Sequence, residues 1–151
     1  MRTGLLLAWL LLSVPAKAEL LEAGTPSEIA VQKAHEMAAA MSRLDVEALL
    51  RFIPETDAVV YVSKGFPIRG NDYRKEIGDS YASLKSLQFK WKRWETTPLS
   101  ETIVIFTGWA ETVEESLAGE RTTESVVFTT VWQREPTGWK RVIAHKSLES
   151  D

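Results

Sequence analysis

The carboxyl-terminal half of the chain constrains the fold most, because it reads as four long strands in succession. Between 87 and 92, apolar residues alternate with polar ones, which is the period-two pattern of a sheet with one solvated face. Segment 102–113 carries apolar residues at both parities, so we expect both of its faces to be covered. Two further strands are predicted over 121–134 and 139–148, joined by a turn at 135–138. Such a sheet needs other elements to cover its apolar face.

Two helices are predicted at the start of the domain. Thr25-Pro26-Ser27-Glu28 has the arrangement of a capping box, with Pro at the first helical position, and predicts a helix over 27–42. Asp45 is the expected cap of a second, short helix, which Pro54 ends.

A hairpin and a third helix are predicted next. Residues 58–62 and 66–68 are rich in strand-forming side chains and flank a break, which predicts a small hairpin. Gly70-Asn71 starts the third helix, with Asn71 as its expected cap. One stripe of this helix carries Tyr73, Ile77 and Tyr81. Helices followed by long strands indicate a single α+β domain with the sheet curved around the helices.

The first 18 residues read as a secretory signal peptide. Arg2 precedes an apolar run over 5–12, and Ala16-Lys17-Ala18 has the small residues of a cleavage site. We therefore divide the chain into a signal peptide, 1–18, and one domain, 19–151, that is exported to the periplasm or secreted and leaves the membrane after cleavage. The alternative is an uncleaved anchor, although the run is shorter than the ~20 residues that span a bilayer.

Composition and spacing exclude several kinds of site. The absence of Cys excludes a disulfide framework, a thiolate zinc site and a Cys nucleophile. Asp and Glu number 21 against 18 Lys and Arg, two of which lie in the signal peptide, and this acidic balance argues against nucleic acid as a partner. His35 and His145 have no ligand spacing, and Glu114-Glu115 is expected as a charged loop pair, so we predict no metal and no cofactor.

The closing segment VWQREPTGWKRVIAHKS, residues 131–147, carries a resemblance to a known group. It joins a Val-Trp strand, a charged turn ending in Gly, a second Trp and a strand that closes on His-x-Ser. This pattern resembles the NTF2-like superfamily, and within it the DUF4440/SnoaL-like/SgcJ-EcaC group, which is similar to the association domain of calcium/calmodulin-dependent protein kinase II. GFPIRG at 65–70 also fits, and the likeness covers most of 28–148.

The resemblance implies an NTF2-like, or cystatin-like, conical half-barrel. Three amino-terminal helices would pack in a curved, mostly antiparallel sheet, with a cavity between the sheet and the first helix. The outer face of the sheet often forms a dimer in this superfamily. Its members include isomerases, cyclases, hydratases, dehydratases and non-catalytic binding or assembly domains, so the resemblance informs fold more than chemistry.

Strand parity and the resemblance together give candidate ligand contacts. Lys146 follows the His of His-x-Ser, where the kinase association domain has an inward basic residue, so it is a candidate contact for an anion. The alternatives are an ion pair with Glu124 or a solvated lysine. Thr130 stands where that domain has an arginine, which weakens any anion site, and Trp132 is either an aromatic wall or a core residue. Parity assigns Arg141 to the opposite, outward face.

Two weak catalytic candidates remain. Asp57 precedes the first strand, close to where ketosteroid isomerases of the superfamily place a carboxylate base, and Tyr61 or Tyr81 are the candidate donors opposite it. His145 has a suitable ordinary pKa, but parity places it opposite Lys146. The alternatives are a solvated loop Asp, a structural His and tyrosines of the core.

Three functions follow from these observations. The first is a non-catalytic domain that binds a small organic, and by the resemblance anionic, molecule in the cavity. The second is a dimeric assembly module that pairs through the outer sheet face, where Trp109, Val127 and Val131 are expected. The third is an isomerase, cyclase or dehydratase that abstracts a proton next to a carbonyl, using Asp57 or His145.

Overall fold

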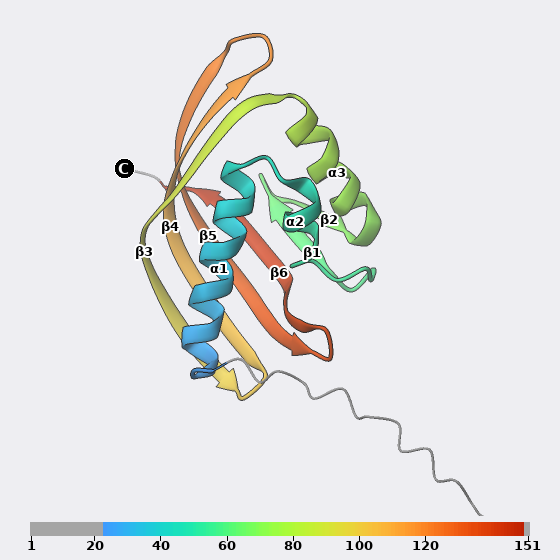
Figure 1. Ribbon diagram of the computed structural model, residues 1–151, viewed down its shortest axis with the longest axis vertical. Coiled ribbons are helices and arrows are strands. Elements are labelled where there is room, and N and C mark those ends of the chain that lie inside the picture. The colour runs from blue at the N-terminus through green and yellow to red at the C-terminus, as the bar shows by residue number, and fades with distance from the viewer. Residues whose placement is uncertain (1–22, 150–151) are drawn as a thin grey trace, which may run out of the picture.

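Three helices precede and interrupt a sheet of six strands (Figure 1). The computed structural model describes residues 23–149, and the signal peptide predicted for 1–18 lies outside them. The elements are α1 (Pro26–Ser42), α2 (Val46–Leu50), β1 (Val60–Ser63), β2 (Phe66–Arg69), α3 (Gly70–Ala82), β3 (Leu84–Ser100), β4 (Ile103–Ser116), β5 (Arg121–Glu135) and β6 (Gly138–Leu148). The predicted order of elements is confirmed.

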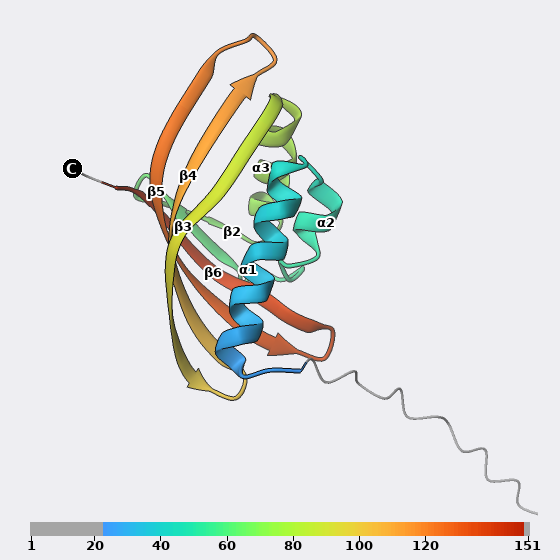
Figure 2. The ribbon, with the colours of Figure 1, turned by 60° about the vertical axis from the view of Figure 1, so that its left-hand side comes forward.

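The strands form one sheet in the order β2-β1-β6-β5-β4-β3. All neighbours are antiparallel except β1 and β6, which run parallel. The sheet curves strongly, and α1 lies along its concave side with α2 and α3 beside it (Figures 1 and 2). The predicted α+β class with a curved, mostly antiparallel sheet is therefore confirmed.

Local side-chain contacts explain where the helices begin. In the predicted capping box, the Glu28 carboxylate accepts from the Thr25 backbone N–H at 2.8 Å, and the Thr25 hydroxyl accepts from the Glu28 N–H at 3.3 Å. Asp45 caps α2 as predicted. The prediction of Asn71 as the third cap is wrong, because α3 already begins at Gly70 and has no side-chain cap.

Small residues on α1 let the helix approach the sheet closely. Ala30 and Ala34 are fully buried against it, and the Ala34 carbonyl accepts a hydrogen bond from the Trp91 indole at 3.3 Å. Trp91 in turn lies over Gly108, where a Cβ would come within 2.4 Å of its ring. Phe106 and Trp132 fill the space between the middle of α1 and the sheet, so this part of the interior is a packed core.

A bulge in β6 changes which side chains face inward. Trp132 of β5 pairs with Arg141, whereas the preceding Val131 pairs with Ile143, so Val142 is an extra residue in β6. Parity therefore holds only after the bulge. The prediction that Arg141 points outward is wrong, because the bulge turns it to the concave side, where it is buried.

The convex face of the sheet is covered less than predicted. Outward residues of β4 are half-buried rather than buried, and Arg93 of β3 stacks over Trp109 at 3.6 Å from the ring centre. Figure 2 shows no other element on this side of the described sheet. None of the helices within 23–149 is long and apolar enough to cross a membrane.

Candidate functional site

A cavity of about 540 Å³ opens beside the carboxyl-terminal half of α1. Its walls come from α1, α3, the β1–β2 hairpin and the concave side of the sheet. The side chains that line it include aromatic rings, charged groups and a threonine: Tyr61, Phe66, Tyr73, Tyr81, Phe89, Thr112, Glu114, Phe128, Arg141 and Lys146. The expected cavity thus exists, but it lies mainly toward α3 and the hairpin, because aromatic side chains fill the space directly between α1 and the sheet.

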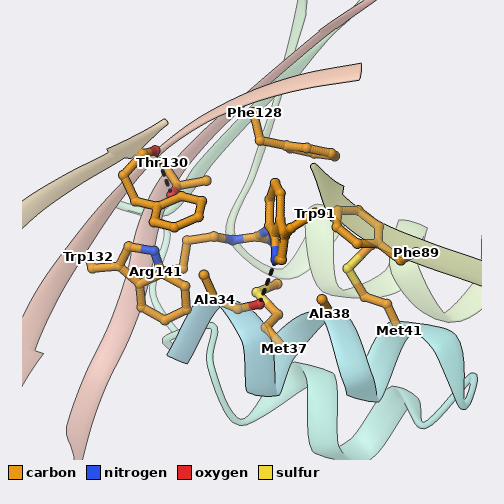
Figure 3. A pocket seen from close by; sticks show the side chains of 11 residues that line it. Ala34, Met37, Ala38, Met41, Phe89, Trp91, Phe128, Thr130, Trp132 and Arg141 are labelled. Carbon is orange, nitrogen blue, oxygen red and sulfur yellow. Dashed lines mark hydrogen bonds between the residues drawn. The ribbon is translucent and has the colours of Figure 1, made fainter. Parts of the chain in front are cut away.

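A small inner chamber continues the cavity under α1 (Figure 3). Its volume of about 20 Å³ has room for a water molecule or a few ligand atoms. Arg141, Phe89 and Phe128 line both spaces. The Arg141 side chain crosses from the sheet toward the aromatic rings in the middle of this region (Figure 3).

Arg141 is the most unusual charge in the structure. It is 6% exposed, and its guanidinium donates a hydrogen bond to the Tyr73 hydroxyl. Its backbone N–H donates to the Phe52 carbonyl at 2.7 Å, which holds the start of β6 in place. Within residues 23–149 no carboxylate forms an ion pair with Arg141. Buried charges are normally paired, so this guanidinium lacks a counter-ion.

All three tyrosines of the chain line the same cavity. Tyr61 stacks on Tyr73 with 4.7 Å between ring centres. Burial raises the pKa of Tyr61, Tyr73 and Tyr81, although the nearby Arg141 opposes the shift in each case. All three hydroxyls are therefore protonated at neutral pH and have a proton to donate.

Lys146 lines the cavity, on the side that the resemblance implied for it. It already has a partner, because its ammonium donates to the Glu124 carboxylate at 2.8 Å. Both side chains are partly exposed, at 22% and 30%. Of the alternatives considered from sequence, the structure has the Lys–Glu ion pair, with one face of Lys146 left on the cavity.

Thr130 and Trp132 lie at the inner chamber rather than at the larger cavity. The Thr130 hydroxyl donates to the Phe106 carbonyl at 3.2 Å. Trp132 is 1% exposed and belongs to the core cluster, and its indole N–H has no hydrogen-bond partner among residues 23–149. Figure 3 shows this nitrogen on the side of the ring that faces Arg141.

Neither catalytic candidate reaches the cavity. Asp57 is exposed ahead of β1 and contacts Gly70, whose Cβ position would lie 2.9 Å from the Asp57 Cα. His145 is exposed on the convex face, where it pairs with Thr129 of β5. Tyr61 and Tyr81, their proposed partners, do line the cavity. The structure therefore separates the candidate donors from the candidate bases.

Sequence reasoning missed two residues that line the cavity with charges. Arg141 was assigned outward because the bulge at Val142 is a property of strand pairing and leaves no mark in the sequence. Glu114 was expected in a loop, but β4 continues to Ser116 and places it on the inward side with Thr112. The predicted strand ended at Val113, one residue before Glu114, and the charged pair Glu114-Glu115 gave no local indication that the strand continues.

Among the described residues, no group of three or more His, Cys, Asp or Glu side chains is placed to hold a metal ion.

Solved structures with this architecture are numerous, although no family model and no curated protein matches the sequence. A proposed dehydratase from the NTF2-like family of Streptomyces avermitilis is 20% identical with a TM-score of 0.72, over 83% of this chain and 97% of that one. An NTF2-like superfamily protein from Salmonella enterica is 12% identical with a TM-score of 0.75, over 82% and 91%. The association domain of C. elegans CaMKII is 17% identical with a TM-score of 0.63, over 80% and 94%.

The chain has the NTF2-like fold. The resemblance inferred from the closing segment is confirmed at that level, and so is the conical half-barrel. Identities this low speak to the fold alone, so chemistry must come from the cavity itself.

Proposed function

We propose that the protein binds a small organic anion, with an apolar body, in the cavity beside α1. The observation that carries this proposal is the buried and unpaired guanidinium of Arg141. A ligand carboxylate at Arg141 would supply the missing counter-charge and accept bidentate hydrogen bonds from the guanidinium fork. The hydroxyl of Tyr73, whose oxygen already accepts from Arg141, is free to donate its own proton to the same carboxylate.

The rest of the cavity suits the apolar part of such a ligand. Phe89 and Phe128 form one wall and Tyr61 another, and the volume of about 540 Å³ lies in the usual range for small-molecule sites. Phe66 at the tip of the β1–β2 hairpin is 74% exposed yet lines the opening. An exposed aromatic ring at the opening has apolar area that a bound ligand would cover.

The structural neighbours support this proposal only broadly. One is named as a proposed dehydratase and another as an association domain. An enzyme that uses Asp57 or His145 as its base is less well supported, because neither residue lines the cavity. Binding without chemistry therefore remains the first choice.

Calorimetry with simple probes tests the proposal. Phenylpropionate and octanoate are compared with their neutral amides, which match them in shape. We expect the carboxylates to bind at least about tenfold more tightly than the amides to the wild-type protein, and the difference to disappear in Arg141→Met. Arg121→Met, which removes an exposed arginine, is the matched control and should bind like wild type. Equal binding of acids and amides by the wild-type protein would refute the proposal.

A second proposal is that the protein forms a homodimer through the convex face of the sheet. An apolar row crosses three strands in register there, from Ile105 through Val131 to Ile143, and Ile143 is 44% exposed. We expect a dimer in sedimentation equilibrium at micromolar concentration and a monomer for Ile143→Lys. A wild-type monomer under these conditions would refute this proposal.

We also propose that the protein is exported, on the strength of the signal peptide expected at 1–18. Edman sequencing of the protein from cell fractions should give an amino terminus at Glu19 in the exported fraction. An intact Met1 on a membrane-bound protein would instead establish the anchor.

A further inference from the structure

We infer that the preferred ligand is a zwitterion, with an ammonium group at the end opposite its carboxylate. This inference rests on the proposed function, since it concerns the far end of the molecule that Arg141 binds. It is carried by a second unpaired charge in the same cavity, the carboxylate of Glu114 on β4.

Glu114 differs from the acidic residues around it. Glu115 pairs with Lys85 at 2.5 Å, Glu111 with Lys92 at 3.2 Å, and Glu124 with Lys146 at 2.8 Å. Glu114 is half-buried and lines the cavity, and its carboxylate forms no ion pair or hydrogen bond within residues 23–149. Each of these neighbouring carboxylates on the sheet has a lysine, whereas Glu114 has none. Glu76 of α3 also lines the cavity but is exposed to solvent, so Glu114 is the half-buried carboxylate that lacks a cation.

The wall around Glu114 has a second polar group without a partner. Thr112 lies two residues earlier on the inward side of β4 and is 4% exposed. Its hydroxyl makes no hydrogen bond to any described residue. A buried hydroxyl without a partner costs free energy, so a ligand group that pairs with it gains affinity. Carboxylate and hydroxyl together suit an ammonium group, which has three donors.

The two unpaired charges belong to one space. Burial is the main reason that the pKa of Tyr61 and of Tyr81 is raised. In both tyrosines the charge of Arg141 opposes this shift, whereas the charge of Glu114 adds to it. Both tyrosines are therefore within electrostatic range of both charges. The other cations that line the cavity do not neutralise Glu114, because Lys146 is bound to Glu124 and Lys64 is exposed on the hairpin.

The cavity is thus bipolar. Arg141 offers a positive charge at the inner end and Glu114 a negative charge at the β4 wall, with Phe89 and Phe128 between them. A molecule with one charge would leave the other protein charge partly desolvated and unpaired, which costs free energy. A molecule with a carboxylate, an apolar body and an ammonium group pairs both.

Matched acids with and without an amine test the inference. Aminohexanoate, aminooctanoate and aminodecanoate, each with its amine on the terminal carbon, are compared by calorimetry with hexanoate, octanoate and decanoate. At the chain length that spans the cavity, we expect the amino acid to bind the wild-type protein at least about tenfold more tightly than the plain acid. Glu114→Gln should remove this preference and bind the plain acid at least as tightly as the wild-type protein does, because it has no carboxylate to desolvate.

Glu115→Gln is the matched control, because Glu115 is adjacent in sequence but pairs with Lys85 on the other side of the strand. It should keep the full preference for the amine. A wild-type protein without that preference at any length, or a Glu114→Gln variant that keeps it, overturns the inference. If the binding of plain acids still depends on Arg141, the proposed function stands even when the inference fails. If no probe binds the wild-type protein, both the inference and the proposed function are overturned.

Discussion

Replacing Arg141 by Met should make the unliganded protein more stable while it loses its ligand. A buried charge without a partner costs about 3–5 kcal/mol, and Met has a similar length without the charge. The replacement also removes the hydrogen bond from Arg141 to Tyr73, worth about 1.5–3 kcal/mol as a charged hydrogen bond. With mid-range values of about 4 and about 2 kcal/mol, the difference is a net gain of about 2 kcal/mol in the free energy of unfolding.

Thermal unfolding measures this gain. An unfolding entropy of about 2.1 cal/mol/K per residue gives roughly 0.3 kcal/mol/K for residues 23–149, so the melting temperature should rise by about 7 °C. Arg121→Met, at an exposed position, should change it by no more than about 2 °C. A residue kept for binding at the expense of stability behaves this way.

The opposite result would refute the reasoning. If Arg141→Met lowers the melting temperature by several degrees, the guanidinium is a structural element that the fold needs. The unpaired charge would then give no reason to expect an anion in the cavity. Denaturation by urea should be run beside the thermal scan, because an unchanged m-value shows that the variant unfolds from the same compact state.

Three other predictions concern the interior and the amino-terminal helix. Because the pKa of Tyr61, Tyr73 and Tyr81 is raised in the folded protein, their contribution to stability is complete below pH ~10 and is lost as the pH rises further. Absorbance at 295 nm should therefore show no phenolate until the protein unfolds in alkali. A tyrosine that titrates near pH 10 in the folded protein would contradict this prediction. Gly108→Ala should cost about 1–3 kcal/mol in urea unfolding, since the added Cβ would lie 2.4 Å from a Trp91 ring atom. Gly78→Ala, inside α3 with open space around the added Cβ, should instead stabilise the protein by about 0.5–1 kcal/mol. Hydrogen bonds from Thr25 lower the pKa of Glu28, so the stability that Glu28 contributes is present above pH ~4.3 and is lost as the pH falls. The melting temperature of Glu28→Gln should therefore decline less steeply below pH ~4 than that of the wild-type protein. Equal slopes for the two proteins would count against the capping box.

Much of the fold could be predicted because its determinants are local. The capping box at Thr25 and Glu28 and the cap at Asp45 act within one helical turn, and alternation along β3 and β5 depends only on neighbouring residues. The inward direction of Lys146 came instead from the resemblance of the closing segment, and Lys146 lies beyond the bulge, where the alternation of the strand is undisturbed.

The charges of the cavity depend on pairing between distant strands, which local patterns do not report. The register shift opposite Trp132 reverses the orientation of Arg141, and the length of β4 decides that Glu114 faces inward. The base candidates illustrate the same point. Asp57 lies in a loop whose direction is set by its contact with Gly70, so nothing in its own neighbourhood shows that it lies outside the cavity.

The strand order also bears on when the domain completes itself during synthesis. The β1–β2 hairpin joins the sheet only through β6, which is the last strand to leave the ribosome. Until β6 is made, the hairpin has no neighbour, and Arg141 and Lys146 do not yet exist in the growing chain. A polypeptide organised in this way stays incompletely folded until its last strand has been translated.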